Sequence, residues 1–151
     1  MRASSLLILA LFLWTVCERS SAAEPGGIAV AVVVGTEFRG ELTREDLRDI
    51  FLQKRRFWES GIKIQAVNLP PTHRARHDFS SRVLGATPEE LDDYWKELYF
   101  HGEHPPYVFQ SEEAVLRFVA QTPGAIGYVS ACAADKRVRV IWQSEPANCQ
   151  R

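Results

Sequence analysis

The segment at residues 28–34 (IAVAVVV) constrains the fold of this chain more than any other, because it is continuously apolar and rich in β-branched residues. A strand with one face in water alternates apolar and polar residues, whereas a strand covered on both faces does not. The segment therefore predicts an interior strand of a sheet that has other elements packed on both sides. With 151 residues, the chain has the length of one ordinary domain and leaves no room for a second substantial module.

The first 23 residues have the three parts of a secretory signal peptide. Arg2 gives the basic start, residues 6–16 (LLILALFLWTV) form the apolar stretch, and small residues ending at Ala23 form the cleavage site. A membrane-spanning helix needs about 20 apolar residues, and charged residues end this run earlier. We expect export to the periplasm and removal of this segment, which leaves residues 24–151 as one domain. The alternative is an uncleaved N-terminal anchor.

Helix signals and strand signals alternate along the rest of the chain. Three helices are expected to begin at a Ser or Thr cap, and Gly85 is expected to end another. The helices are predicted after Thr43, over residues 72–84, after Thr87 and after Ser111, and further strands at residues 62–67, 126–129 and 138–142. This alternation favours a layered α/β fold, here a mixed sheet of about four strands flanked by helices.

The third of these helices carries the most complete signal. Thr87 and Glu90 have the spacing of a capping box, and Pro88 stands at the first helical position. Apolar and aromatic residues then recur at helical spacing. They predict a buried stripe made of Leu91, Tyr94, Trp95 and Leu98.

The composition disfavours several classes of function. With 46% hydrophobic residues, 25% charged residues and a formal net charge of −1, the chain is typical of a folded globular protein. It lacks the strongly positive field with which proteins attract nucleic acids, so no nucleic-acid partner is expected. No serine lies in a Gly-x-Ser-x-Gly elbow, and no acid pair can be assigned to one cleft. We therefore expect a protein that is not an enzyme and uses no cofactor.

Three cysteines are too few for a zinc ribbon or a disulfide-rich miniprotein. Cys17 leaves with the signal peptide, so the exported chain keeps Cys132 and Cys149, an even pair in a compartment that permits disulfides. We predict a bond between them, because it would tie down a C-terminal tail that otherwise frays. The alternative is one buried thiol and one free thiol.

Two segments resemble a known family. Residues 42–52 (LTREDLRDIFL) with Trp58, and above all residues 122–129 (TPGAIGYV), are similar to the phosphate-type periplasmic solute-binding proteins and most of all to their short relatives. The resemblance extends over residues 28–142. It implies a type II periplasmic-binding-protein-like fold in which an oxyanion sits at helix N-termini in a cleft between two lobes. Because the match is to about one lobe, a membrane permease, a sensor or a second subunit that completes the cleft is the implied partner.

The resemblance places the ligand contact at residues 67–77 (VNLPPTHRARH), between a predicted strand and the second predicted helix. A helix start offers unpaired N–H groups to an oxyanion such as phosphate or sulfate, and Thr72 is expected to cap that start or donate its hydroxyl. Arginine side chains add bidentate donors. The predicted ligand-binding residues are Asn68, Thr72, Arg74, Arg76 and, from another helix start, Ser111.

This stretch also departs from the family pattern. Pro70 and Pro71 have no backbone N–H, no glycine lets the backbone fold around an anion, and the Ser-Gly-Thr signature is absent. These departures keep a second hypothesis open, in which the same fold has lost its ligand and serves as an interaction module of the envelope.

Four histidines suggest a third function. His73 and His77 are spaced i, i+4 and share a helix face, while His101 and His104 follow in a loop. Neutral imidazoles are common metal ligands, but this spacing is much less specific than His-Glu-x-x-His. We interpret the four as solvent-facing, so a metal-binding protein ranks below the two other hypotheses.

Overall fold

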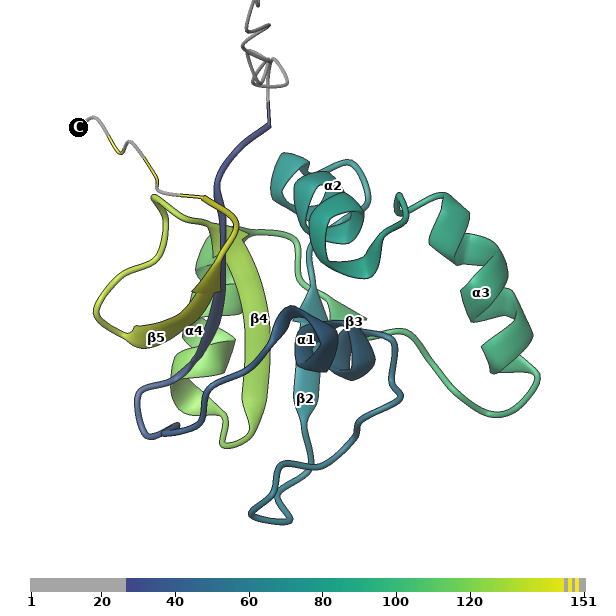
Figure 1. Cartoon of the computed structure of the whole chain (residues 1–151), viewed down its shortest axis with the longest axis horizontal. Coiled ribbons are helices and arrows are strands. Elements are labelled where there is room, and N and C mark those ends of the chain that lie inside the picture. Colours follow the sequence, from purple (N-terminus) through teal and green to yellow (C-terminus); the bar gives the residue numbers. More distant parts are fainter. Residues whose placement is uncertain (1–26, 146, 148, 150–151) are drawn as a thin grey trace, which may run out of the picture.

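The computed structural model describes residues 27–145, 147 and 149, so the predicted signal peptide lies outside the described residues. Within them the chain forms one mixed sheet of five strands in the order β3-β2-β4-β1-β5 (Figure 1). The strands are β1 (Val30–Gly35), β2 (Gln65–Asn68), β3 (Tyr107–Val108), β4 (Ala125–Ser130) and β5 (Val138–Gln143). β2 runs parallel to both β3 and β4, whereas β1 runs antiparallel to β4 and β5. The predicted α/β class is confirmed, and the added strand β3 has only two residues.

β1 is the interior strand that the apolar run predicts. It lies between β4 and β5, and none of its residues from Val30 to Val34 is more than 1% exposed. Both faces of this strand are covered, which explains why the sequence there shows no polar alternation.

Four α-helices and one π-helical turn pack around the sheet within the described residues. They are α1 (Arg44–Phe51), α2 (Arg74–Phe79), the π-helical turn η1 (Ser80–Leu84), α3 (Glu90–Tyr99) and α4 (Glu112–Gln121). α4 covers one face, since a Cβ added to Gly127 of β4 would meet Val115 and Val119 of that helix. The next residue, Tyr128, points to the opposite face, which α1, α2 and η1 cover (Figure 1).

Three aromatic rings form the centre of that second face. The ring of Tyr128 stacks on Phe79 with centroids 4.0 Å apart and planes 6° from parallel. Phe51 of α1 packs against both, at 4.6 Å from Phe79 and 5.7 Å from Tyr128. All three side chains are fully buried, so they join β4 to the two helices that lie above it.

The predicted caps of α1 and α4 are confirmed. Thr43 and Asp46 form both bonds of a capping box, and the hydrogen bond from the Thr43 backbone is the main reason why the pKa of Asp46 is lowered. The Ser111 hydroxyl accepts from the amide of Ala114 at 3.2 Å. Both helix starts therefore follow from local sequence alone.

The predicted start of α2 is wrong. The helix begins at Arg74, and its cap is the His73 ring, whose Nδ1 accepts from the Ala75 amide at 3.2 Å, rather than the Thr72 hydroxyl. The shift follows from chain geometry, because the two prolines before Thr72 hold the chain in a turn that ends one residue later than expected. The end of the segment is predicted correctly: Gly85 closes η1 in the left-handed conformation, at φ 76°.

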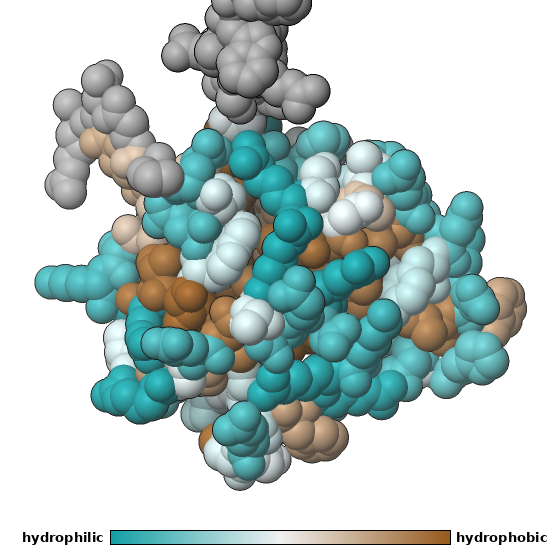
Figure 2. Space-filling view, in the orientation of Figure 1, coloured by the Kyte–Doolittle hydropathy of each residue, from teal (hydrophilic) through white to brown (hydrophobic). Residues whose placement is uncertain are grey.

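α3 differs from the expectation in its burial. Thr87 and Glu90 do form reciprocal capping bonds, but of the predicted stripe only Leu91 is buried, while Tyr94, Trp95 and Leu98 are half-buried. The helix lies to the side of the sheet rather than on it (Figure 1). The apolar stripe therefore stays partly open to solvent, and Figure 2 shows a few hydrophobic residues among hydrophilic ones on the surface over α3.

The predicted disulfide is confirmed: Cys132, in the turn after β4, is bonded to Cys149, beyond the end of β5. The alternative of one buried and one free thiol is thereby excluded. Within residues 27–145, 147 and 149, no helix has the length and apolar character needed to cross a membrane.

The conformation of Gly124 generates a first prediction. Gly124 and Gly85 both have φ near +80°, but a Cβ at Gly124 would lie 2.5 Å from the Lys63 carbonyl oxygen, whereas a Cβ at Gly85 would meet no atom within 4 Å. Gly124→Ala is expected to lower the free energy of unfolding by about 2–4 kcal/mol, and Gly85→Ala by about 1–2 kcal/mol, in urea denaturation. Equal losses at the two positions would contradict the predicted collision.

The side chain of Arg137 generates a second prediction. It bonds Glu113 of α4 at 2.8 and 2.7 Å and Asp135 at 2.7–3.0 Å, and these bonds lower the pKa of each carboxyl group to about 2. A pKa lowered by folding stabilises the fold at neutral pH, and this contribution is lost as the pH falls from the ordinary value of 4.5 for Glu113 toward 2.

Arg137→Gln is expected to raise both pKa values toward their ordinary range in an NMR titration and to flatten the acid limb of the stability profile. Arg117→Gln is the matched control, because Arg117 contacts Glu113 only at 3.5 Å and on the same helix. If the pKa of Glu113 stays near 2 without Arg137, the assigned cause is wrong.

Candidate functional site

The predicted ligand segment lies at the edge where the three parallel strands end, which we call the carboxyl edge. Asn68 ends β2, and Ser130 ends β4. The Phe109 amide donates to the Asn68 carbonyl at 2.8 Å, which brings the chain from β3 to the same place. α4 starts there too, since its Glu112 carboxylate accepts from the Ser130 amide and hydroxyl at 2.5 and 2.9 Å. Three separate segments therefore meet at the carboxyl edge.

A hydrogen-bonded cluster around the Tyr128 hydroxyl occupies the interior of this edge. The hydroxyl accepts from the Leu69 amide at 3.2 Å and from Arg76 Nη1 at 3.4 Å, and it donates to Asn68 Oδ1 at 3.2 Å. One donated and two accepted bonds use the full capacity of a phenol oxygen. We call Asn68, Arg76 and Tyr128 the Tyr128 cluster.

Arg76 is the unusual member of the Tyr128 cluster. It is only 7% exposed, and among the described residues no carboxylate forms an ion pair with it. Its Nε has no hydrogen-bond partner, and neither has the buried hydroxyl of Ser80, one helical turn further along. A buried guanidinium without a counter-charge is costly, and both unpartnered groups can donate. The Arg76 and Ser80 side chains therefore each keep one buried donor that an oxygen acceptor would satisfy.

The burial of Tyr128 sets its protonation state. Desolvation raises the pKa of the phenol, and the neighbouring Arg76 guanidinium and the Leu69 amide oppose that shift only in part. The phenol consequently stays protonated at neutral pH and does not neutralise Arg76.

The expected cradle of free amide hydrogens is only partly available at this turn. The Leu69 amide bonds Tyr128, the His73 amide bonds the Pro70 carbonyl at 2.9 Å, and the Ala75 amide bonds the His73 ring. The two prolines have no amide hydrogen to offer. Three amides near the start of α2 are thus already bonded within the fold and are not available to an anion.

The structure brings together two of the five predicted ligand residues, Asn68 and Arg76. Thr72 is exposed on the turn, and Arg74 is exposed two positions before Arg76, on a different side of α2. The Ser111 hydroxyl is occupied as the cap of α4.

Sequence reasoning missed Tyr128 and Ser80. Tyr128 lies inside the TPGAIGYV segment, and a hydroxyl-bearing residue within an apolar strand was the available signal. Ser80 gives no such signal, because its burial depends on how η1 packs on the sheet.

The histidines do not assemble a metal site within the described part of the chain, where no group of three or more potential ligands occurs. His73 caps α2, and the His104 ring packs against Tyr99 with centroids 5.4 Å apart.

Comparison with known proteins identifies the fold. A phosphate transport receptor of the ABC type from Vibrio cholerae matches 76% of this chain and 46% of its own length, at 23% identity and a TM-score of 0.60. A putative phosphate ABC transporter substrate-binding protein from Clostridium perfringens, solved with bound phosphate, matches 76% of this chain and 45% of its own length. The identity is 18% and the TM-score is 0.59. PstS from Borrelia burgdorferi matches 70% of this chain and 41% of its own length, at 18% identity and a TM-score of 0.54.

The chain therefore has the fold of a single lobe of a phosphate-receptor-like periplasmic binding protein, as the sequence resemblance implies. It spans less than half the length of these solved proteins. No protein-family profile matches the sequence, and no curated protein matches it.

The Tyr128 cluster generates a third prediction. Tyr128→Phe is expected to lower the free energy of unfolding by about 1–3 kcal/mol, because it leaves the Leu69 amide and the Asn68 side chain buried without a partner. The matched control is Tyr94→Phe, which removes a half-buried hydroxyl that makes one bond, to the Leu52 carbonyl at 2.8 Å, and is expected to cost less. A smaller loss for Tyr128→Phe than for Tyr94→Phe in urea denaturation would argue against the cluster.

Proposed function

We propose that this protein is exported to the periplasm and binds a small oxyanion such as phosphate or sulfate at its carboxyl edge, for transport or sensing. The observation that carries the proposal is the burial of Arg76 without a carboxylate partner among the described residues. A guanidinium in that state is stabilised by an anion that can accept two parallel N–H bonds, which the oxygens of phosphate and sulfate do.

The position of Arg76 also supports oxyanion binding at the carboxyl edge. It lies on the first turn of α2 at the edge where the strands of the parallel part of the sheet end, the edge at which open α/β sheets bind ligands. In the low-dielectric surroundings of the Tyr128 cluster a charge-assisted hydrogen bond is stronger than in water. Asn68 of the Tyr128 cluster and, from the rim of this edge, Thr72, Arg74 and Ser111 remain the proposed additional contacts.

The second wall of such a site comes from outside this lobe. The solved receptors are more than twice as long as the part of them that this chain matches. A second subunit, a membrane permease or a sensor that docks on the carboxyl edge is the proposed source of the missing wall. Oxyanion binding by the isolated protein is accordingly expected to be weak.

One observation favours the other hypothesis, a ligand-less interaction module of the envelope. The turn at residues 69–75 has no glycine, and three of its amides are already bonded within the fold. In that case the guanidinium of Arg76 serves the stability of the turn, and the carboxyl edge contacts a protein partner without any anion.

Calorimetric titration of the protein with phosphate and with sulfate at low salt distinguishes these functions. We expect millimolar affinity for both anions and a loss of about tenfold or more in Arg76→Gln, because a hydrogen bond to a charged group contributes about 1.5–3 kcal/mol. Arg82→Gln is the matched control, since Arg82 follows on η1 but is only half-buried and pairs with Glu145.

Arg76→Lys separates binding from folding, because it keeps the charge and removes the bidentate donor. It is expected to retain the fold by circular dichroism while binding more weakly than the wild type. If millimolar phosphate and sulfate produce no heat and no rise in melting temperature, the oxyanion function is wrong for this chain and the interaction module takes its place.

A further inference from the structure

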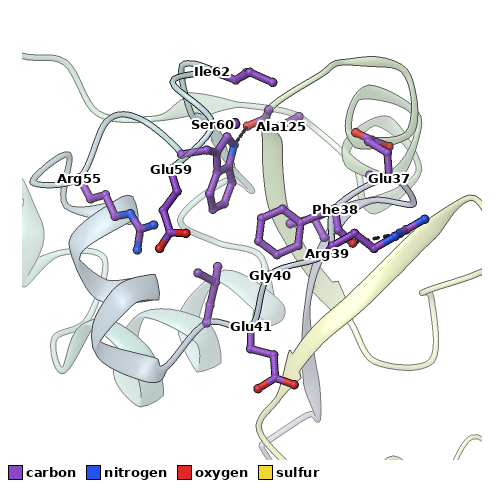
Figure 3. A pocket seen from close by; sticks show the side chains of 15 residues that line it. Glu37, Phe38, Arg39, Gly40, Glu41, Arg55, Glu59, Ser60, Ile62 and Ala125 are labelled. Carbon is purple, nitrogen blue, oxygen red and sulfur yellow. Dashed lines mark hydrogen bonds between the residues drawn. The ribbon is translucent and has the colours of Figure 1, made fainter.

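A cavity of about 470 Å³ opens at the other end of the strands from the Tyr128 cluster (Figure 3). It lies where β1 ends, at Gly35, and where β4 begins, at Ala125, whereas Asn68 and Ser130 mark the other ends of the parallel strands. Protein pockets that bind small molecules usually have volumes of about 300–1,000 Å³, so this cavity has room for a small organic molecule. The proposed oxyanion function makes no use of it.

The walls of this cavity are aromatic and aliphatic. Phe38 and Trp58 face each other with ring centroids 4.9 Å apart and planes tilted by 56°, and Leu42 and Ile62 add aliphatic surface. The Trp58 indole is held in place, because its Nε1 donates to the Gly124 carbonyl at 3.0 Å. The walls are therefore ordered before any ligand enters.

The arginines that line the cavity have partners, whereas the glutamates that line it have no ion-pair partner in the part of the chain that the structure describes. Its two arginines are engaged: Arg55 pairs with Asp46 at 3.0 Å, and Arg39 donates to two backbone carbonyls. Its three glutamates, Glu37, Glu41 and Glu59, form no ion pair within the described residues. Three carboxylates and two guanidinium groups therefore line the cavity, and one of the two guanidinium groups is already neutralised by Asp46.

The unpaired carboxylates differ in direction. Figure 3 shows the Glu59 carboxylate pointing into the opening between Arg55 and Phe38, and the Glu41 carboxylate pointing away from it. The Glu37 carboxylate lies against the Gly35 backbone, where an added Cβ would collide with it. Glu59 is thus the acid that points into the cavity, and Glu37 is a second acid of its lining.

We propose that this cavity binds a small organic cation with an apolar body, of the alkylammonium class. Aromatic faces attract such a cation through the ring quadrupole, and the aliphatic wall accommodates its carbon atoms. The unpaired carboxylates supply complementary charge. An anion of similar size is disfavoured by the same carboxylates, so this site and the proposed oxyanion site take ligands of opposite sign at opposite edges of the sheet.

Choline and its neutral isostere 3,3-dimethylbutan-1-ol test this inference, because they share a shape and differ in charge. In calorimetric titrations at low salt, we expect choline to bind about tenfold more tightly than the alcohol. A choline-dependent shift of the Trp58 indole N–H signal in NMR spectra, absent when phosphate is added, would place the ligand in this cavity rather than at the carboxyl edge.

Charge variants supply the second arm of the test. Glu59→Gln is expected to weaken choline binding about threefold, and the double variant Glu37→Gln, Glu59→Gln about tenfold, in line with partly exposed charges. Glu97→Gln is the matched control, because Glu97 is an exposed acid of α3 that does not line the cavity. All three positions are exposed, so the variants are expected to keep the wild-type circular dichroism and melting temperature.

Three results would overturn the inference. Equal affinity for choline and for the alcohol would mean that the cavity selects shape and not charge, and it would overturn the inference. So would the absence of heat with millimolar choline, or an unchanged affinity in the double variant. None of these results depends on whether phosphate binds at the carboxyl edge.

Discussion

The stacked rings of Tyr128 and Phe79 hold this lobe together and also build its most unusual polar site. The flat contact joins the longest parallel strand to the helical segment α2–η1, and Phe51 closes the same cluster from α1. Because the ring is fixed, its hydroxyl is fixed as well, and that oxygen orients Asn68 and Arg76. The same side chain, Tyr128, therefore fills the core and positions the only buried guanidinium among the described residues.

The lobe separates its chemistry between the two ends of the sheet. The carboxyl edge presents hydrogen-bond donors without a counter-charge, while the opposite edge presents carboxylates around an aromatic cavity. The formal net charge of −1 hides this polarity, because the overall sum says nothing about how the charges are distributed. A partner that approaches one edge meets a different electrostatic surface from a partner that approaches the other.

Local signals in the sequence predicted local structure well. The run at residues 28–34, the caps Thr43 and Ser111 and the terminator Gly85 each depend on neighbouring residues, and each is present in the structure. Features that depend on distant residues were missed or misplaced. Tyr128 meets Arg76 across 52 positions, and the burial of α3 depends on how far it lies from the sheet. The cavity beside Phe38 and Trp58 is assembled from three separate stretches of chain, within residues 34–42, 55–62 and 124–125.

The bond between Cys132 and Cys149 has a topological consequence for β5. That strand is the edge strand of the antiparallel half, and edge strands are the elements that exchange most readily between copies of a protein. Here both flanks of the strand are fastened to one another, with Cα atoms 5.4 Å apart, so the strand forms part of a closed covalent ring. An exchange of β5 between copies would therefore have to move the whole ring closed by the disulfide, whereas reduction would free the C-terminal flank of the strand by itself.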